Sequence, residues 1–433
     1  MGDRQEKLQL WGGIECTVNR VAESYFDQLE YSGHHERLAD LDLIADLGIR
    51  VLRYPVLWER SERPGGEYDF EWADERLGRL YQLGIEPVVG LVHHGSGPQH
   101  TSLVQSCFPE KLAAFATQVA RRYPWVTRFT PVNEPLTTAR FSGLYGHWYP
   151  HGRNDRTFVR ALITQCKGVA LAMSAIRGVN PQARLVQTED MGFTRSTESL
   201  RYQAEFENQR RWLSLDLLAG AVSPSHVMYN YLLRFGATQR ELGFFLDHPM
   251  PPDLVGINYY VTSERFLDDR CGLYAPDRLG GNGRHRYADV EAVRVCTEGL
   301  VGPTEILSSA YRRYQRPVVM TEAHIGSSAA QQSSWLAYVW NAALKARERG
   351  ADVQAVTAWA LLGAHGWDRL VTEPGGHYEA GALSLQDGSL VPTPFATFIR
   401  QLSAGELQRT EAGWWTAAER LAYEPYRSRS RAA

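Results

Sequence analysis

Cysteine is scarce in this chain, and the spacing of the few cysteines does not suggest disulfide bonds or zinc ligation. The 433 residues include five cysteines, and no two of them form a Cys-x-x-Cys pair. Disulfide frameworks and zinc sites both rely on regularly spaced cysteine pairs, so neither is expected. The N-terminal sequence MGDRQEKLQLWGG also lacks the apolar core of a signal peptide. Together these absences predict a protein of the reducing cytoplasm.

A large excess of charge is absent too, as are long apolar runs. The formal net charge is −3, with 22% charged and 44% hydrophobic residues. This balance is ordinary for a globular protein and gives no reason to expect nucleic acid as a partner. No stretch approaches the roughly eighteen apolar residues that suggest a membrane-spanning helix, so no membrane partner is expected.

What the chain does have is a regular alternation of short apolar runs and longer amphipathic segments. Strands are predicted at 8–15, 49–54, 85–94, 125–135, 183–190, 251–260, 316–324 and 353–362. A helical pattern follows each of them, at 35–48, 74–84, 110–124, 156–179, near 198–219, and at 304–314, 331–350 and 394–402. Eight such units in one chain, with no GxGxxG after the first strand, predict a closed (β/α)₈ TIM barrel rather than an open sheet.

The same pattern sets the expected domain organisation. Residues 1–405 are predicted to form a single barrel domain, and residues 406–433 a C-terminal tail. Residues 268–300, which contain the turn-forming sequence LGGNGRHR, are expected to be a long loop on the barrel.

Polar residues gather where the predicted strands end, and in a TIM barrel those ends form the active site. In strand order they are Glu15 and Asn19, Arg53, His93 and His94, Asn133 and Glu134, Glu189 and Asp190, Asn258 and Tyr260, Glu322, and Trp359. We expect His93 and His94 to point to opposite faces of their strand, which argues against a metal site there. The strand end carrying Glu189 and Asp190 is expected to be solvated.

Two carboxylates in this set, Glu134 and Glu322, come from strands on opposite sides of the mouth. A pair of carboxyl groups about 5–5.5 Å apart is the arrangement of a retaining glycosidase. In that chemistry Glu322 attacks the sugar, kept ionised by Arg53. Glu134 is the acid, held protonated by the neighbouring negative charge. Asn133 is expected to hold a sugar hydroxyl. Such a reaction needs no metal and no cofactor.

Several motifs resemble family 1 of the glycoside hydrolases, over about residues 10 to 402. They are LDLIADLGIRVLRYPVLWER, LGIEPVVGLVHH, TPVNEP, DLVGINYY, VVMTEAH and AWALLGAHGW. The resemblance implies Glu134 as acid/base and Glu322 as nucleophile. It also implies substrate contacts from Asn133, Arg53, His93, Asn258, Tyr260, Trp359, Trp367 and Asn19. Tyr260, the last residue of DLVGINYY, is expected to orient Glu322 by a hydrogen bond.

The chain departs from the family pattern on the sugar-binding side. Ala323-His324 stands where the family has Asn-Gly, and His94 stands for a tryptophan. Asn19 is shorter than the family's glutamine, and Gly366 replaces a glutamate that grips the outer hydroxyls. Since a site that binds a hydroxyl discriminates strongly by that contact, its loss predicts a sugar other than ordinary glucose or galactose.

The sequence therefore predicts a retaining β-glycosidase with an altered glycon, acting on a small-molecule glycoside or oligosaccharide. Two alternatives stay open: a transglycosidase that passes the sugar to an acceptor, and a non-catalytic sugar-binding barrel. The sequence leaves the oligomeric state open.

Overall fold

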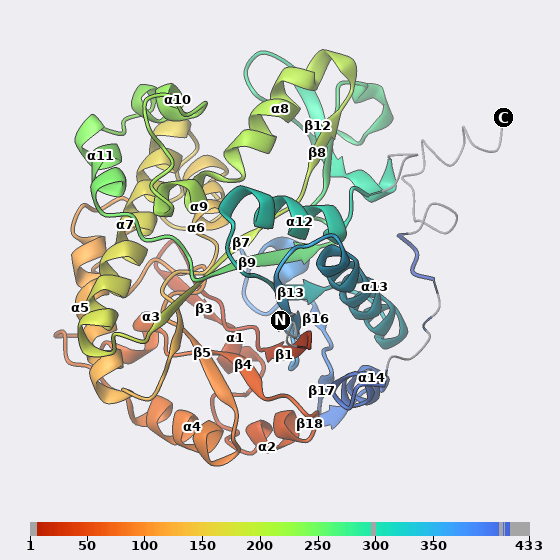
Figure 1. The fold of residues 1–433 in the computed structure, drawn as a ribbon. Helices are drawn as coiled ribbons and strands as arrows, with labels where there is room; N and C mark the ends of the chain where they lie inside the picture. Colours follow the sequence, from red (N-terminus) through yellow and green to blue (C-terminus); the bar gives the residue numbers. More distant parts are fainter. Residues whose placement is uncertain (1–6, 296–299, 407–409, 411, 416–433) are drawn as a thin grey trace, which may run out of the picture.

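The computed structural model describes residues 7–295, 300–406, 410 and 412–415. Eight parallel strands close into a barrel in the order β1-β14-β13-β9-β7-β6-β5-β4, and helices surround it (Figure 1). The strands are β1 (Gln9–Gly13), β4 (Val51–Pro55), β5 (Glu86–Gly90), β6 (Arg128–Thr130), β7 (Arg184–Asp190), β9 (Leu254–Tyr260), β13 (Val318–His324) and β14 (Val353–Ala358). The predicted (β/α)₈ barrel is confirmed.

The outer helices begin and end close to the predicted positions. The main ones are α2 (Asp40–Ala45), α4 (Glu71–Gln82), α5 (Phe108–Arg122), α7 (Asp155–Val179), α12 (Pro303–Tyr314), α13 (Ala329–Glu348) and α14 (Pro394–Ser403). The other α-helices are α1 (Gln28–Tyr31), α3 (Trp58–Ser61), α6 (Pro135–Ala139), α8 (Arg201–Arg210), α9 (Leu213–Leu218), α10 (Tyr229–Arg234) and α11 (Gln239–Asp247). Their apolar faces pack on the strands. A separate buried cluster takes one residue from each of seven barrel strands: Trp11, Val51, Val88, Val186, Leu254, Val319 and Ala355.

Helix α7 is the longest helix in the described part of the chain. By length and composition alone it passes as a membrane span. Fourteen of its residues are buried within the protein, however, and its neighbour is α5. It is therefore explained as a core helix of the barrel.

The expectation of a long loop at 268–300 is wrong. Strands β11 (Leu279–Gly281) and β12 (Arg286–Glu291) form an antiparallel hairpin, and β12 pairs with β10 (Arg265–Asp268), which pairs with β8 (Thr194–Ser196). The hairpin turns over residues 282–285, where Gly283 has a left-handed backbone with φ +80°. Residues 296–299 lie outside the described residues. This small sheet stands beside α8 above the barrel (Figure 1).

Other short pairs complete the mouth and the C-terminal end. They are β2 (Val18–Val21) with β3 (Ser24–Asp27), β15 (Ala364–His365) with β16 (Tyr378–Glu379), and β17 (Leu383–Gln386) with β18 (Ser389–Pro392). Within the predicted tail, Trp415 is buried and packs edge-on against Trp335 of α13 at 4.9 Å. Residues 407–409, 411 and 416–433 lie outside the described residues.

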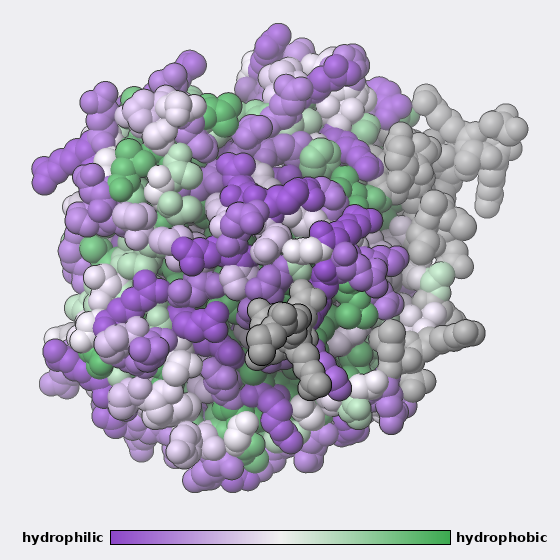
Figure 2. All heavy atoms as spheres, viewed as in Figure 1, coloured by the Kyte–Doolittle hydropathy of each residue, from purple (hydrophilic) through white to green (hydrophobic). Residues whose placement is uncertain are grey.

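The surface seen in Figure 2 is mostly hydrophilic. Apolar residues appear on this face as small patches scattered among charged and polar ones. That is the usual distribution for a folded protein, in which single exposed apolar residues carry no functional meaning.

Candidate active site

Glu134 lies in a sharp turn between β6 and α6. Strand β6 ends at Thr130, and Glu134 adopts a left-handed backbone with φ +47° before Pro135 starts the helix. A non-glycine residue in this region is strained, and such strain persists where the surrounding structure fixes it. Proline is well suited to the first helical position, because its missing N–H has no partner there. The turn directs a carboxylate that is only 3% exposed into the barrel mouth.

Asn258 of β9 holds Glu134 in place. Its Nδ2 donates to Glu134 Oε1, and its Oδ1 accepts from the Thr321 hydroxyl at 2.6 Å. Burial raises the pKa of Glu134 well above its ordinary value, and the charges of Glu322, Asp190 and Glu189 raise it further. Burial is thus the larger cause, where the sequence had suggested like-charge repulsion alone. These causes favour the protonated form of Glu134.

Glu322 near the end of β13 has a different environment. Arg53 NH1 donates to its Oε1 at 2.7 Å and to the Thr321 carbonyl at 2.8 Å, and the Tyr260 hydroxyl donates to its Oε2. Burial raises the pKa of Glu322, and these two partners oppose the rise. Arg53 therefore favours the ionised form of Glu322 next to a protonated Glu134. Together with the bonds of Asn258 and Thr321, these contacts join both glutamates in one network.

The expectation that His93 and His94 point to opposite faces is wrong. Strand β5 ends at Gly90, and His94 has a left-handed backbone with φ +56°, so the alternation of a strand no longer applies. Asn133 Nδ2 donates to both rings, at 3.2 Å to His93 Nε2 and 3.3 Å to His94 Nε2. Burial lowers the pKa of His94 to about 3 and that of His93 well below its ordinary value. Both imidazoles are neutral acceptors at the mouth.

Asn133 is the centre of this group. Its Oδ1 accepts from Arg53 NH2 and from the Thr188 hydroxyl, each at 2.8 Å. Both sides of the amide are thus engaged by protein. A sugar hydroxyl that binds Asn133 would have to compete with the two longer bonds to the histidines.

The predicted solvated end at Glu189 and Asp190 is also wrong for Glu189. Its carboxylate is fully buried and accepts from the backbone N–H groups of Leu136 and Thr137 at the start of α6, and from the Ser214 hydroxyl. It anchors the helix that follows Glu134, and every one of these partners belongs to the protein. Asp190 is less buried, and it accepts a hydrogen bond from Ser263.

The predicted sugar contacts near β1 and β14 bond to other parts of the protein. Asn19 Nδ2 donates to the Val371 carbonyl at 2.9 Å, and its Oδ1 is buried with no partner among the described residues. The Trp367 indole donates to Glu15 Oε2 at 3.1 Å. Gly366 has a left-handed backbone with φ +71°, which disfavours any side chain at this position.

Trp359 directly follows β14 and connects these groups to the histidines. It is 3% exposed, its ring stacks on His93 at 5.7 Å, and Arg53 lies over it at 4.8 Å. The Trp359 carbonyl meets His324 Nδ1 at 2.9 Å, while His324 Nε2 meets Glu379 at 3.1 Å. The sequence had marked His324 only as a departure from the family pattern. In the structure, His324 supports the backbone of Trp359 and is itself held by Glu379.

The structure thus brings together all ten predicted site residues at one end of the barrel. It adds Thr321 and Glu379, and it gives contacts to Glu15 and His324, to which the sequence analysis had assigned no role. Within the described ranges, no three His, Cys, Asp or Glu side chains gather as a metal site would require.

Comparisons with known proteins agree with the barrel fold. No family model matches the chain. Beta-glucosidase 4 of Oryza sativa subsp. japonica is 22% identical over 407 residues, 83% of this chain and 82% of the relative. Aryl-phospho-beta-D-glucosidase BglH of Bacillus subtilis is 23% identical over 370 residues, 76% of each chain. A beta-glucosidase from Thermotoga maritima, solved in complex with glucoimidazole, has a TM-score of 0.75 at 15% identity and shows the same fold, covering 93% of this chain and 99% of its own.

The barrel and these relatives define the class as a glycoside hydrolase. The low identity and the altered residues near β1 and β14 then give a narrower placement. The chain resembles the family 1 glycoside hydrolases as a divergent relative of them.

Proposed function

We propose that the protein is a retaining β-glycosidase in which Glu322 is the nucleophile and Glu134 the acid/base. The observation that carries this proposal is the unequal environment of two buried glutamates in one network. Arg53 and Tyr260 bind Glu322, whereas Glu134 is buried next to further negative charge. When the surroundings of two neighbouring carboxyl groups give them different pKa values, the one that keeps its proton can act as the acid and the ionised one as the nucleophile.

In the first step a Glu322 oxygen attacks the anomeric carbon. The bond to the leaving oxygen breaks, and that oxygen takes the proton of Glu134. In the second step water gives a proton to Glu134 and attacks the same carbon, which releases Glu322. Arg53 and Tyr260 hold Glu322 in position throughout. The neutral His93, with Asn133 and Asn258, is placed to bind sugar hydroxyls.

We further propose that the sugar differs from ordinary glucose or galactose. Three features support this: Asn19 is bound to Val371, Trp367 is bound to Glu15, and Gly366 has a backbone that suits no glutamate. The unpaired Asn19 Oδ1 and the Glu15 carboxylate would face the sugar instead, as acceptors for its hydroxyls. The substrate is a small glycoside or oligosaccharide, and the cytoplasmic location stays a prediction.

A panel of activated aryl β-glycosides tests both proposals. It should include hexoses, 6-deoxyhexoses and pentoses, with release of the phenol as the readout. The wild type should hydrolyse one sugar class best, and Glu134→Gln should lose most of that rate. Glu23→Gln, at an exposed position in the turn after β2, is the control and should match the wild type. A folded wild type that cleaves nothing in the panel would contradict the proposed activity.

A further inference from the structure

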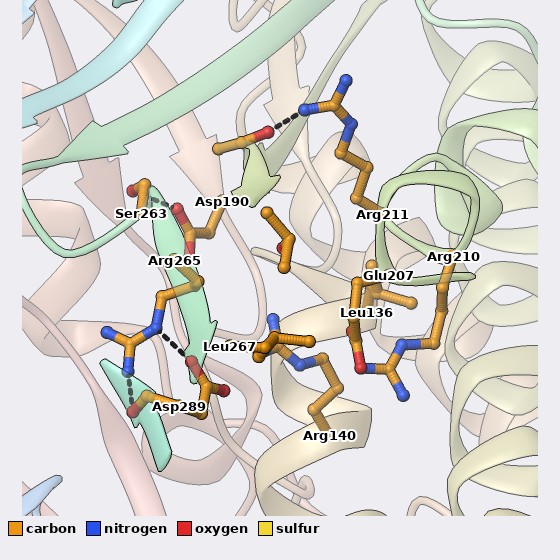
Figure 3. Close-up of a pocket in the computed structure, with 12 residues that line it drawn as sticks. Leu136, Arg140, Asp190, Glu207, Arg210, Arg211, Ser263, Arg265, Leu267 and Asp289 are labelled. Atoms are coloured by element: carbon orange, nitrogen blue, oxygen red, sulfur yellow. Dashed lines mark hydrogen bonds and ion pairs between the residues drawn. The ribbon is translucent and has the colours of Figure 1, made fainter. Parts of the chain in front are cut away.

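A polar cavity lies beside the proposed acid, between α8 and the small sheet of β8, β10 and β12 (Figure 3). The empty space between its lining residues is about 490 Å³, and this figure includes the part that is open to solvent. Four arginines line it: Arg140, Arg210, Arg211 and Arg265. None of these residues belongs to the network around Glu134 and Glu322.

The cavity is directly connected to the residues that hold Glu134. Asp190, in its wall, pairs with Asn258 in the register of β7 and β9. The next residue, Met191, donates its N–H to the Asn258 carbonyl at 3.0 Å, and Asn258 in turn donates to Glu134. Because the leaving oxygen must lie next to the acid, a group attached to that oxygen would extend towards this cavity.

Most charges in the cavity wall are already satisfied. Glu207 binds Arg210, and Asp289 binds Arg265 at 2.8 Å. Arg211 NH1 donates to the Gly192 carbonyl.

Arg140 is the exception. Its Nε donates to the Tyr145 hydroxyl at 3.3 Å and its guanidinium lies over the Tyr145 ring at 5.5 Å, but its two terminal nitrogens have no hydrogen-bond partner among the described residues. In Figure 3 its guanidinium reaches into the space between Arg265 and Arg210, and no dashed line meets it.

The backbone places Arg140 there by a local irregularity. Arg140 begins a π-helical turn, Arg140–Leu144, directly after α6. Such turns are rare and often occur at functional sites, because they re-aim a side chain. Since α6 starts at Pro135, the proposed acid and this arginine are fixed at the two ends of one short helix.

The charge balance favours an anion. Four guanidinium groups face three carboxylates in the wall, Asp190, Glu207 and Asp289. Arg140 lies close enough to Arg210 and Arg265 for their positive charges to repel. Among the wall carboxylates, Asp190 is the one whose charge acts on Glu134, and the charges of Arg140 and Arg265 lower the pKa of Asp190. An arginine whose terminal nitrogens have no hydrogen-bond partner among the described residues, in a cavity with excess positive charge, is suited to a planar anion.

We propose that this cavity receives the leaving group of the glycoside, and that this group carries a carboxylate or phosphate that Arg140 binds. The inference rests on the proposed glycosidase function and adds the chemistry of the leaving group to it. The sugar itself would be bound by the residues given under the proposed function, which are not among those that line this cavity. The two halves of the substrate are therefore recognised by different groups.

Paired substrates test the proposal. With the sugar found by the panel, the 4-carboxyphenyl glycoside is compared with the 4-carbamoylphenyl glycoside, which has the same shape without the charge. A 4-(phosphonomethyl)phenyl glycoside tests phosphate as the source of the anion. The wild type should prefer an anionic substrate by about tenfold or more in kcat/KM, the size of a hydrogen bond to a charged group.

The variants assign this preference to Arg140. Arg140→Met should bring the ratio of anionic to neutral substrate close to one, and Arg140→Lys should keep part of it. Arg201→Met removes an exposed arginine from the start of α8 and should keep the wild-type ratio. A wild-type ratio near one for both anions, or a preference that survives Arg140→Met, would overturn the proposal.

A binding measurement separates this proposal from the proposed function. Calorimetric titration with benzoate, phenyl phosphate and neutral benzamide needs no turnover. The wild type should bind at least one of the anions about tenfold more tightly than Arg140→Met does, with no such difference for benzamide. If the protein hydrolyses neutral glycosides but the two proteins bind both anions equally, the cavity proposal fails alone. If no glycoside is cleaved yet the anions distinguish the two proteins, the proposed activity fails and the anion site stands.

Discussion

The two sides of the barrel mouth differ in how their polar groups are used. Around Glu134 and Glu322, side chains from different strands bond to one another, and these bonds oppose the rise in pKa that burial causes in both carboxyl groups. Near β1 and β14, Asn19 and Trp367 bond instead to Val371 and Glu15. The side with the two glutamates has the contacts that the proposed reaction needs, while on the other side two predicted sugar contacts bond to the protein instead. Under the proposed function, reaction and specificity would then occupy separable parts of the site.

The largest effect should follow from Glu322→Gln, which keeps the shape of the side chain and removes the nucleophile. Turnover of an activated aryl glycoside should fall by at least about 10⁴-fold, because the covalent route is lost. Initial rates measure the effect, and circular dichroism checks that the variant is folded. Retention of most of the activity would show that another group attacks the sugar.

Glu134→Gln should have a large effect that depends on the leaving group. Poor leaving groups need a proton, so their hydrolysis should slow by about 10²–10⁴-fold, while a dinitrophenyl glycoside should lose less in its first step. The pH profile gives the second test. Since burial raises the pKa of Glu134, the wild-type rate should fall as pH rises through that raised pKa, and the variant should lack this alkaline limb. Equal losses for all leaving groups would argue against the acid role.

The same raised pKa of Glu134 has a consequence for stability. Folded Glu134 keeps its proton at pH values where the unfolded chain has lost it, so the free energy of unfolding should fall as pH rises above the ordinary carboxyl range. The slope should approach about 1.4 kcal/mol per pH unit for this one group. Denaturant titrations of wild type and Glu134→Gln at several pH values measure the difference, which should grow with pH. A constant difference would contradict the burial argument.

On the rebuilt side, Glu15→Gln should change specificity more than rate. The neutral amide can still accept from the Trp367 indole but loses the charge that would bind sugar hydroxyls. We expect the relative kcat/KM values of two sugars in the panel to shift by about tenfold. An unchanged ranking of the sugars would show that Glu15 does not determine which sugar the protein prefers.

The smallest effect should come from His324→Ala. This histidine connects Trp359 to Glu379 and does not contact the two catalytic candidates in the described structure. Loss of the bond between His324 and the Trp359 carbonyl should leave Trp359 less ordered. This should raise KM several-fold, with kcat little changed. Glu379→Gln tests the same connection from the other end. A large loss of kcat in either variant would mean that His324 takes part in the reaction itself.

The sequence predicts the barrel well, because strand and helix periodicities are local signals that repeat eight times. Its failures have physical causes. The sheet of β10, β11 and β12 was missed because its strands are short, although Asn282-Gly283 marks the hairpin. The common direction of His93 and His94 depends on where β5 ends. The burial of Glu189 depends on α6 folding over it. The bond between Glu15 and Trp367 joins residues 352 positions apart in the sequence, so no local sequence pattern could predict it.

Covalent trapping tests the central claim most directly. A 2-deoxy-2-fluoro glycoside with an activated leaving group, built on the sugar found by the panel, forms a glycosyl-enzyme that breaks down slowly. Mass spectrometry of the digested wild type should find the sugar on the peptide that contains Glu322, while Glu322→Gln should stay unlabelled. Label on another residue, or normal turnover without any trapped intermediate, would contradict the assignment of Glu322 as the nucleophile of a retaining enzyme.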